Sequence, residues 1–309
     1  METPVGLFIF RRPETTERVF ATIRGARPKT LLVISDGART NNEEDAERVS
    51  RTRAVVSKVD WPCEVKLNFS DHNMGCKRRV SSGLDWVFGQ VERAIILEDD
   101  CLPHPSFFSF CEELLEKYAN NPRIMHISGD NFQPGRRTPN SYYFSRYPHV
   151  WGWASWRRAW KAYDVGLQGF DRLGRDVLRQ IFSSTAEQSY WHSVLTNVVN
   201  GKIDTWDYQW AYACLKSDSL SIVPEVNLIS NIGFGAESTH TRDASPLANL
   251  PVFAMDEPML HPSSIEWNRE ADAFTFNHHF GGDEIAEDMK LRNRMRRSLG
   301  ALTRYVLPR

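Results

Sequence analysis

The sequence predicts an α/β protein with a mixed, mostly parallel sheet flanked by helices. Short apolar runs alternate with amphipathic stretches through the first half of the chain, which is the rhythm of βαβ units with right-handed crossovers. One of these runs, residues 94–97, is followed at once by three acids, residues 98–100. Acids at that position are expected at the sheet edge where open α/β folds bind their ligands.

The first-half elements follow one another in a regular order. Strands are predicted at residues 5–10, 30–35, 64–69, 93–97 and 123–128 from their short, β-branched apolar runs. Helices are predicted at residues 13–23, from 42, from 76 and at 104–118. Pro13 suits the first turn of its helix, because the missing N–H would have no partner there anyway.

The second half is less regular. Residues 142–163 hold four tryptophans around one glycine, and helices are predicted at 171–182, 185–199 and 205–217. A strand and its exit follow at 219–230, and then a loop at 233–241 that contains glycine. Residues 243–279 are rich in Pro, Asn and His with weak periodicity, so we predict irregular structure there.

Composition narrows the functional classes. The 309 residues suffice for one large domain or two smaller ones, and 38 basic residues balance 39 acidic ones, which gives no general attraction to nucleic acid. The chain has five cysteines: Cys63, Cys76, Cys101, Cys111 and Cys214. Because their number is odd and no two form a CxxC pair, we expect free thiols in a reducing compartment. Without a membrane-length apolar run or a signal segment, we expect a soluble cytoplasmic protein.

The acids Glu98, Asp99 and Asp100 are the first candidate site. They offer hard oxygen ligands with no adjacent His or Cys, which favours Mg²⁺ or Mn²⁺ over zinc. Such ions bind through one or two carboxylates and let substrate phosphates complete their shell. The alternative is structural: the acids cap the helix near Pro105 or pair with Arg93.

Two further groups are expected at the same edge. Asp36 ends an earlier strand of the sheet and could accept hydrogen bonds from a nucleobase or a ribose, although an ordinary Asp-Gly turn is the better explanation of this residue taken alone. Arg11 and Arg12 directly follow the first strand. They suit contacts with a diphosphate or a base, and a solvated arginine pair is the alternative.

Asp207 is expected in the first turn of a helix capped by Asp204 or Thr205, between Trp206 and Trp210. The helix dipole favours its ionised form, and neighbouring aromatic rings can stack on sugars. A carboxylate so placed can take a proton from an attacking hydroxyl. The simpler interpretation is a capping acid.

The tryptophan-rich segment could line a carbohydrate cleft, with Trp151 and Trp153 as stacking surfaces and Gly152 allowing a ligand close to the backbone. Aromatic stripes are more often core, so at least half of these tryptophans should pack inside. His240 follows the glycine-bearing loop and might serve a metal, but surface histidine is the default, as for His278 and His279.

The last segment, residues 287–309, carries a stripe of leucine and methionine surrounded by arginine and lysine. A basic amphipathic helix of this kind can lie on an anionic membrane, here the inner membrane. A helix docked on its own domain or on a second subunit is the alternative.

Taken together, these motifs resemble the GT-A glycosyltransferases, a Rossmann-like fold, and most closely the inverting, manganese-dependent N-acetylglucosaminyltransferase I family. The shared features come in the same order: "ILEDDCLPHPSFFSF", "HISGDNFQP", "VWGWASW", "TWDYQW" and "VPEVNLISNIGFG". The resemblance covers about residues 5–240. That family works behind a membrane anchor, so the relatives implied here are cytoplasmic bacterial enzymes that build surface polysaccharide or lipopolysaccharide.

The resemblance implies a role for each site residue. Asp100 would bind the metal directly, Asp99 would hold the ribose or a water around the metal, and Glu98 would meet the base or the donor sugar. Asp36 would hold uracil, and Arg11, or equally Arg12, would lie near the nucleotide. Asp207 would be the catalytic base. Asp130 and Asn131 would face the sugars, and His240 would correspond loosely to a metal-binding histidine.

The resulting hypothesis is an inverting hexosyltransferase that uses Mn²⁺ or Mg²⁺ to move a sugar from a nucleotide diphosphate sugar, a UDP-sugar by preference, to a glycan or glycolipid hydroxyl. Residues 1–245 would form the catalytic domain, with about 1–130 binding the donor and about 131–245 the acceptor and base. Residues 246–309 would be an extension. The alternatives are a sugar-1-phosphate nucleotidyltransferase, against which "FIFRRPETTERV" lacks the expected glycine-rich loop, and a carbohydrate-binding protein without activity.

Overall fold

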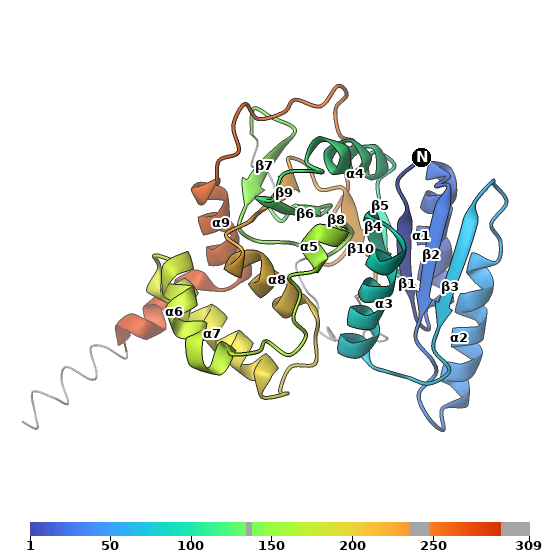
Figure 1. Ribbon diagram of the computed structural model, residues 1–309, viewed down its shortest axis with the longest axis horizontal. Helices are drawn as coiled ribbons and strands as arrows, with labels where there is room; N and C mark the ends of the chain where they lie inside the picture. The colour runs from blue at the N-terminus through green and yellow to red at the C-terminus, as the bar shows by residue number, and fades with distance from the viewer. Residues whose placement is uncertain (134–137, 235–246, 292–309) are drawn as a thin grey trace, which may run out of the picture.

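The computed structural model describes residues 1–133, 138–234 and 247–291. Its centre is a sheet of eight strands in the order β3-β2-β1-β4-β8-β6-β9-β7 (Figure 1). The first four are parallel: β1 (Val5–Ile9), β2 (Thr30–Ser35), β3 (Glu64–Phe69) and β4 (Arg93–Glu98). The other four are β6 (Ile124–Ser128), β7 (Tyr142–Ser145), β8 (Trp153–Trp156) and β9 (Leu220–Pro224). The predicted α/β class with a large, Rossmann-like sheet is confirmed.

The change of strand direction occurs beside β4. Strand β8 runs antiparallel to both β4 and β6, whereas β6 and β9 are parallel to each other. A separate two-stranded ribbon pairs β5 (Cys101–Pro103) with β10 (Ile229–Asn231). Because only two residues separate the end of β4 from the start of β5, this ribbon brings residues near 231 next to the acids at the end of β4.

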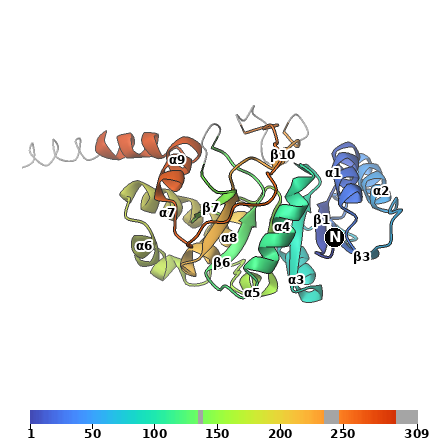
Figure 2. The ribbon, with the colours of Figure 1, turned by 90° about the horizontal axis from the view of Figure 1, so that it is seen from above.

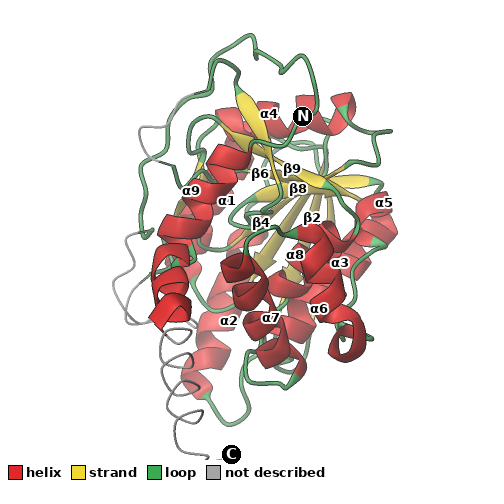
Figure 3. Cartoon of the chain, turned by 90° about the vertical axis from the view of Figure 1, so that its left-hand side faces the viewer, coloured by secondary structure: helices red, strands yellow, loops and turns green. Residues whose placement is uncertain are grey.

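Helices cover both faces of the sheet, as Figure 3 shows. On one face, α1 (Pro13–Ala26), α2 (Glu43–Val56) and α4 (Ser106–Lys117) bury a core with the strands. On the other face lie α3 (Cys76–Gln90), α5 (Arg157–Trp160) and α8 (Asp207–Lys216). The helices α6 (Phe170–Ile181) and α7 (Thr185–Val199) lie at the end of the molecule opposite α1 and α2 (Figure 2).

Local sequence explains the helix starts in the first half. Pro13 is the first residue of α1, as predicted. Asn42 precedes α2 and its side chain accepts a hydrogen bond from the Asp45 backbone N–H at 3.0 Å, which satisfies one of the free donors of the first turn. The predicted apolar face of α3 is buried as well, at Val80, Leu84, Val87 and Phe88.

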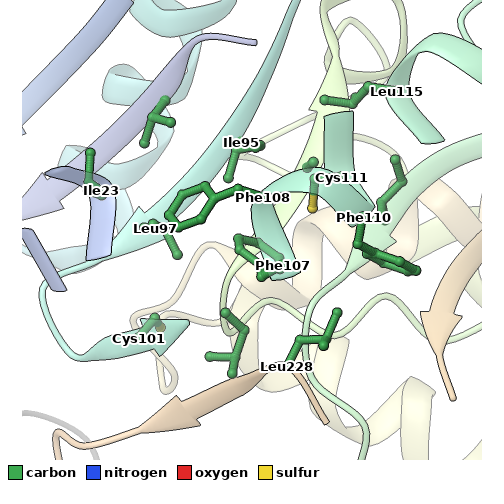
Figure 4. Close-up of a cluster of buried hydrophobic side chains, with 14 of the residues drawn as sticks. Ile23, Ile95, Leu97, Cys101, Phe107, Phe108, Phe110, Cys111, Leu115 and Leu228 are labelled. Carbon is green, nitrogen blue, oxygen red and sulfur yellow. The ribbon is translucent and has the colours of Figure 1, made fainter. Parts of the chain in front are cut away.

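Strand β4 is held firmly behind its acids. Its four inner residues, 94–97, are at most 1% exposed. In Figure 4, Ile95 and Leu97 lie against Phe107 and Phe108 of α4, with Cys101 of β5 nearby. Because this packing fixes the end of strand β4, the carboxylates that follow have little conformational freedom, as a preorganised binding site requires.

Two sequence predictions are wrong. Residues 243–279 were expected to be irregular, but Arg269–His279 form helix α9, capped by the Asn268 side chain. Its buried positions include Asp272 and Thr275, so its inward face is half polar and gives no apolar period. Helix α8 is not capped by Asp204 or Thr205, because its N-cap is Trp206 and no side chain caps it.

No helix in the described part of the chain is long and apolar enough to cross a membrane. All five cysteines lie in the described ranges and are free. Most of the predicted basic C-terminal helix falls beyond residue 291, outside the described residues.

Candidate functional site

The candidate site is built where β1, β2 and β4 end side by side. Glu98 is the last residue of β4 and pairs in register with Phe8 of β1. Successive strand residues point to opposite faces, so Glu98 lies on the α3 face with Phe8, and Asp99 turns to the α1 face. There one carboxylate oxygen of Asp99 accepts a hydrogen bond from the Phe10 N–H at 2.9 Å.

Arg12 joins the acids from the end of β1. Its guanidinium pairs with Asp99 at 3.5 Å and makes a short contact with Asp100. Burial opposes the charge of Arg12, but Asp99 and Asp100 outweigh it and raise the pKa of Arg12. The structural alternative for the acids is not observed, since Arg93 pairs with Glu116 and no side chain caps α4.

The acids also act on one another. Burial is the main cause that raises the pKa of both Glu98 and Asp99, and the negative charge of Asp100 adds to it. One arginine therefore faces three clustered carboxyls. A further positive charge at this edge of the sheet would reduce the repulsion among them. A divalent cation would meet that need.

Gly233 packs directly against Asp100. The Ile232 N–H donates to the Asp100 backbone carbonyl at 2.8 Å, and a Cβ added at Gly233 would lie 2.0 Å from Asp100 Oδ2. Only glycine fits at position 233, because the Asp100 carboxylate occupies the place that a Cβ would take. Sequence reasoning noted the glycines of this loop but missed the contact, because 133 positions separate the two residues and only the β5–β10 pairing joins them.

The carboxylates suit Mg²⁺ or Mn²⁺ bound through few protein ligands. The oxygen donors are hard, and the absence of a Cβ at Gly233 lets the Asp100 carboxylate lie directly against the backbone of residue 233. Within the described ranges, no group of three or more His, Cys, Asp or Glu side chains is arranged to hold a metal alone. A metal here would need a ligand of the substrate, such as a diphosphate, to complete its shell.

Asp36 lies at the same edge and holds a loop. Its carboxylate accepts hydrogen bonds from the N–H groups of Gly37, Met74 and Gly75 and from the side chain of Asn73, at 2.9–3.2 Å. It thereby fixes the segment that leads into α3. A contact between Asp36 and uracil remains a prediction, and Asn73 is a partner that sequence reasoning did not find.

Two arginines, Arg53 (half-buried) and Arg79 (buried), reinforce the same loop, and no sequence motif pointed to them. Arg53 donates to the backbone carbonyls of Asp36 and Ser70 at 3.0 and 2.7 Å. Arg79 donates to the carbonyl of Ser35 at 3.2 Å. Arg53 and Arg79 therefore link the ends of β2 and β3. Their guanidinium groups are engaged in these structural hydrogen bonds.

The structure separates the two arginines that follow β1. Arg11 pairs with Asp45 at 3.1 Å, and Arg39 pairs with the same carboxylate. Arg12 alone of the two adjacent residues reaches Asp99 and Asp100. Which arginine faces the acids depends on the backbone entering α1, which the residue pattern does not reveal.

Asp207 is the first residue of α8. One carboxylate oxygen accepts from the Tyr208 N–H at 2.8 Å and from the Thr205 hydroxyl, and the other has no partner among the described residues. Asp207 lies on the same side of the sheet as Glu98. Burial raises the pKa of Cys76, and both Glu98 and Asp207 contribute to that rise.

The tryptophans predicted to contact a sugar differ in burial. Trp153 is 1% exposed and stacks on His126 and Trp206 with ring centroids 5.1 and 5.8 Å apart. Trp153 and Trp206 are core residues in this arrangement, so their predicted contact with a sugar would require movement. Trp151 is half-buried and contacts the rings of Phe132 and Phe234.

Gly152 has φ of +64°, and a Cβ there would lie 2.5 Å from the side chain of Ile229. The backbone of Gly152 therefore packs closely against strand β10, in the place where a ligand was predicted. Substitution at Gly152 would disturb the ribbon that carries Gly233 as well as the backbone of residue 152 itself.

Asp130 and Asn131 follow β6. Asn131 donates to the carbonyls of Pro224 and Glu225 at 2.7 and 2.9 Å, so its side chain anchors the chain after β9. Asp130 is 1% exposed, and burial raises the pKa of its carboxyl. Its two oxygens have no hydrogen-bond partner among the described residues.

Of the three histidines named from the sequence, the two in the described ranges, His278 and His279, make contacts away from the acids. His240 lies outside the described residues. His279 is in contact with the Phe132 carbonyl through Nε2, and burial lowers its pKa. His278 packs on Phe274 with ring centroids 4.3 Å apart.

Comparison with solved structures returned distant likenesses. One is UDP-glucose pyrophosphorylase complexed with UDP-glucose, with 10% identity, 73% of this chain and 90% of that chain covered, and a TM-score of 0.36. A second is 4-diphosphocytidyl-2C-methyl-D-erythritol synthase from Anaerococcus prevotii, with 9% identity, coverage of 65% and 84%, and a TM-score of 0.32. At these TM-scores the likeness decides nothing about function.

A third structure is HddC from Yersinia pseudotuberculosis complexed with GMP-PN, with 9% identity, coverage of 42% and 60%, and a TM-score of 0.28. No protein-family model matches this chain. No curated protein sequence matches it either.

Proposed function

We propose that this protein is a metal-dependent enzyme that binds a nucleotide diphosphate sugar, preferably a UDP-sugar, and transfers the sugar to an acceptor hydroxyl with inversion. The observation that carries the proposal is the acid cluster at the end of β4, which faces one arginine and leaves Asp100 Oδ2 beside a glycine. The resemblance to the N-acetylglucosaminyltransferase I family supports this choice of reaction. Surface polysaccharide or lipopolysaccharide would be the product.

In this mechanism Asp100 would hold the divalent ion, with Asp99 and Glu98 around the nucleotide. The leaving diphosphate would have its developing charge neutralised by the ion. Asp207, with one carboxylate oxygen unpartnered within the described structure, would take the proton from the acceptor hydroxyl. The hydrogen bonds from the Tyr208 N–H and the Thr205 hydroxyl would hold the Asp207 carboxylate in position for that step.

A sugar-1-phosphate nucleotidyltransferase is the second candidate, and one observation favours it. Arg12, a basic residue directly after the first strand, faces the acids as a group that handles a leaving pyrophosphate would. Such an enzyme would use the same metal and a nucleotide. The two candidates differ in the second substrate, which is a hydroxyl in one and a nucleoside triphosphate in the other.

The test is a thermal-shift panel of UDP-, GDP-, dTDP- and CMP-sugars with and without Mn²⁺. A ligand at a hundred times its Kd stabilises the native state by about 2.7 kcal/mol, which raises Tm by several degrees. We expect a manganese-dependent rise with one nucleotide family, absent in Asp100→Ala and retained in the control Asp60→Ala, whose carboxylate pairs with Arg24. No rise with any nucleotide would contradict both enzymatic candidates and favour a carbohydrate-binding protein without activity.

Product analysis then separates the candidates. Release of UDP from a UDP-sugar, faster with acceptor glycans, would support glycosyl transfer. Release of pyrophosphate from UTP and a sugar-1-phosphate would support the nucleotidyltransferase instead.

A further inference from the structure

Arg12 supplies the positive charge that the β4 acids have in this structure. Its guanidinium contacts Asp99 at 3.5 Å and reaches Asp100 Oδ2 more closely. The other oxygen of Asp99 is taken by the Phe10 N–H. The second oxygen of Asp100 meets only the Cys101 thiol, at 3.6 Å. Within the described chain, the acids are therefore compensated mainly by this one side chain.

Arg12 and a divalent ion would compete for one atom. Asp100 Oδ2 is the oxygen that Arg12 contacts, and the other oxygen, Oδ1, accepts from the Cys101 thiol. An ion held by the Oδ2 of Asp100 would therefore take the place of the Arg12 guanidinium. A carboxylate oxygen bound to Mn²⁺ or Mg²⁺ cannot keep a guanidinium at the same distance without two cations repelling each other at close range. Occupation of Asp100 by a metal therefore requires Arg12 to withdraw.

The backbone of Arg12 is fixed while its side chain is free to turn. The Arg12 carbonyl accepts from the Thr16 N–H at 3.0 Å and from the Thr16 hydroxyl at 2.6 Å, at the start of α1. The Arg12 side chain is 17% exposed, and among the described residues its guanidinium bonds only to the two acids. A change of rotamer would thus release it without unfolding any element.

We infer that Arg12 is an exchangeable counter-ion, which leaves Asp100 when a divalent ion arrives and then binds the diphosphate that accompanies it. This rests on the proposed nucleotide-dependent function. The planar guanidinium matches the geometry of phosphate oxygens and forms strong, charge-assisted hydrogen bonds with them. Metal without diphosphate would leave Arg12 half-buried and unpaired, so the free ion should bind weakly and the metal–diphosphate complex well.

The first experiment measures binding of Mn²⁺ alone to the full chain by calorimetry. Arg12→Gln removes the competitor and should tighten Mn²⁺ binding about tenfold, if Arg12 holds Asp100 about nine-tenths of the time. Arg39→Gln removes one positive charge from the same end of the molecule, and Asp45 keeps Arg11 as its partner. This control should bind Mn²⁺ as the unsubstituted protein does.

The second experiment measures binding of UDP in saturating Mn²⁺. Arg12→Gln should weaken it about tenfold or more, because a charge-assisted hydrogen bond to phosphate is lost. The two effects have opposite signs, so a loss of folding cannot produce both. Arg12→Gln/Asp100→Asn should lose the gain in Mn²⁺ affinity, which locates the competition at Asp100.

The outcomes separate this inference from the proposed function. Unchanged or weaker Mn²⁺ binding in Arg12→Gln, in a protein whose unsubstituted form binds Mn²⁺–UDP, overturns the exchange and leaves the function standing. Equal tightening in Arg12→Gln and Arg39→Gln also overturns it, as a general effect of charge. Tightening in Arg12→Gln alone supports the exchange even if no nucleotide binds, in which case the proposed function fails by itself.

Discussion

Gly233→Ala should disable the candidate metal site while leaving the fold nearly intact. The added Cβ would lie 2.0 Å from Asp100 Oδ2 and 2.7 Å from its Cβ and Cγ, whereas real Cβ contacts under 3.0 Å essentially do not occur. The Asp100 side chain must therefore move by about 1 Å or more. A misplacement of about 1 Å in a reacting group can cost about a hundredfold in rate.

The assay is the change in Tm on adding Mn²⁺ with the nucleotide sugar that the panel identifies. Gly233→Ala should abolish the change. Its Tm without ligand should fall modestly, because rotation of the half-buried Asp100 side chain removes the clash with Oδ2 and a backbone shift of a few tenths of an ångström removes the contact with Cβ. Gly25→Ala is the matched control, since a Cβ at Gly25 meets nothing within 4 Å. An undiminished Mn²⁺-dependent rise in Gly233→Ala would refute the placement of the metal on Asp100.

Three further predictions follow from the described contacts. Asp207→Asn should lower kcat about 10²- to 10⁴-fold with unchanged UDP binding, while Asp204→Asn keeps its rate; near-normal turnover in Asp207→Asn would exclude it as the base. Asp36→Ala removes the acceptor of four hydrogen bonds from residues 37 and 73–75, so Tm should fall and nucleotide binding should weaken as the loop loosens. Thermal shift measures both effects, with Asp71→Ala as the control. Burial raises the pKa of Asp272 from 3.8 to about 6, so the unfolded chain ionises first and the free energy of unfolding should fall by up to about 3 kcal/mol between pH 4 and 7. Asp272→Asn can keep its partners Ser145, Arg146 and Trp267 and should remove that pH step in urea unfolding; an unchanged step would contradict the assignment.

The sheet and its edge were predictable because they depend on local pattern. Apolar runs of four to six residues define β1, β2 and β4, and a parallel sheet aligns their ends, so acids placed after such runs must meet. The helices between them carry clear start signals at Pro13 and Asn42. Helix α9 was missed because its buried face includes Asp272 and Thr275, whose partners lie on other elements.

The contacts of the site were less predictable, because they join residues distant in the sequence. Asp36 is satisfied by residues 73–75, and Asp100 is packed by Gly233. Neither partner has a pattern that points to the other. The tryptophans illustrate a different limit: Trp153 and Trp151 are two positions apart, yet one is in the core and the other half-buried, as burial depends on how β8 enters the sheet.

Three separate segments converge on Asp100, and this convergence bears on how a ligand would enter. Arg12 comes from the end of β1, Asp100 from the end of β4 and Gly233 from the end of β10. The first can move by rotation of a side chain, whereas the third is tied to β5 by strand pairing and to Asp100 by the Ile232 N–H. In the proposed exchange, a cation that approaches Asp100 would displace the Arg12 side chain, whereas the backbone at Gly233 would stay in place. Substitutions at Arg12 should consequently change the affinity for metal in a graded way, and substitutions at Gly233 should remove it outright.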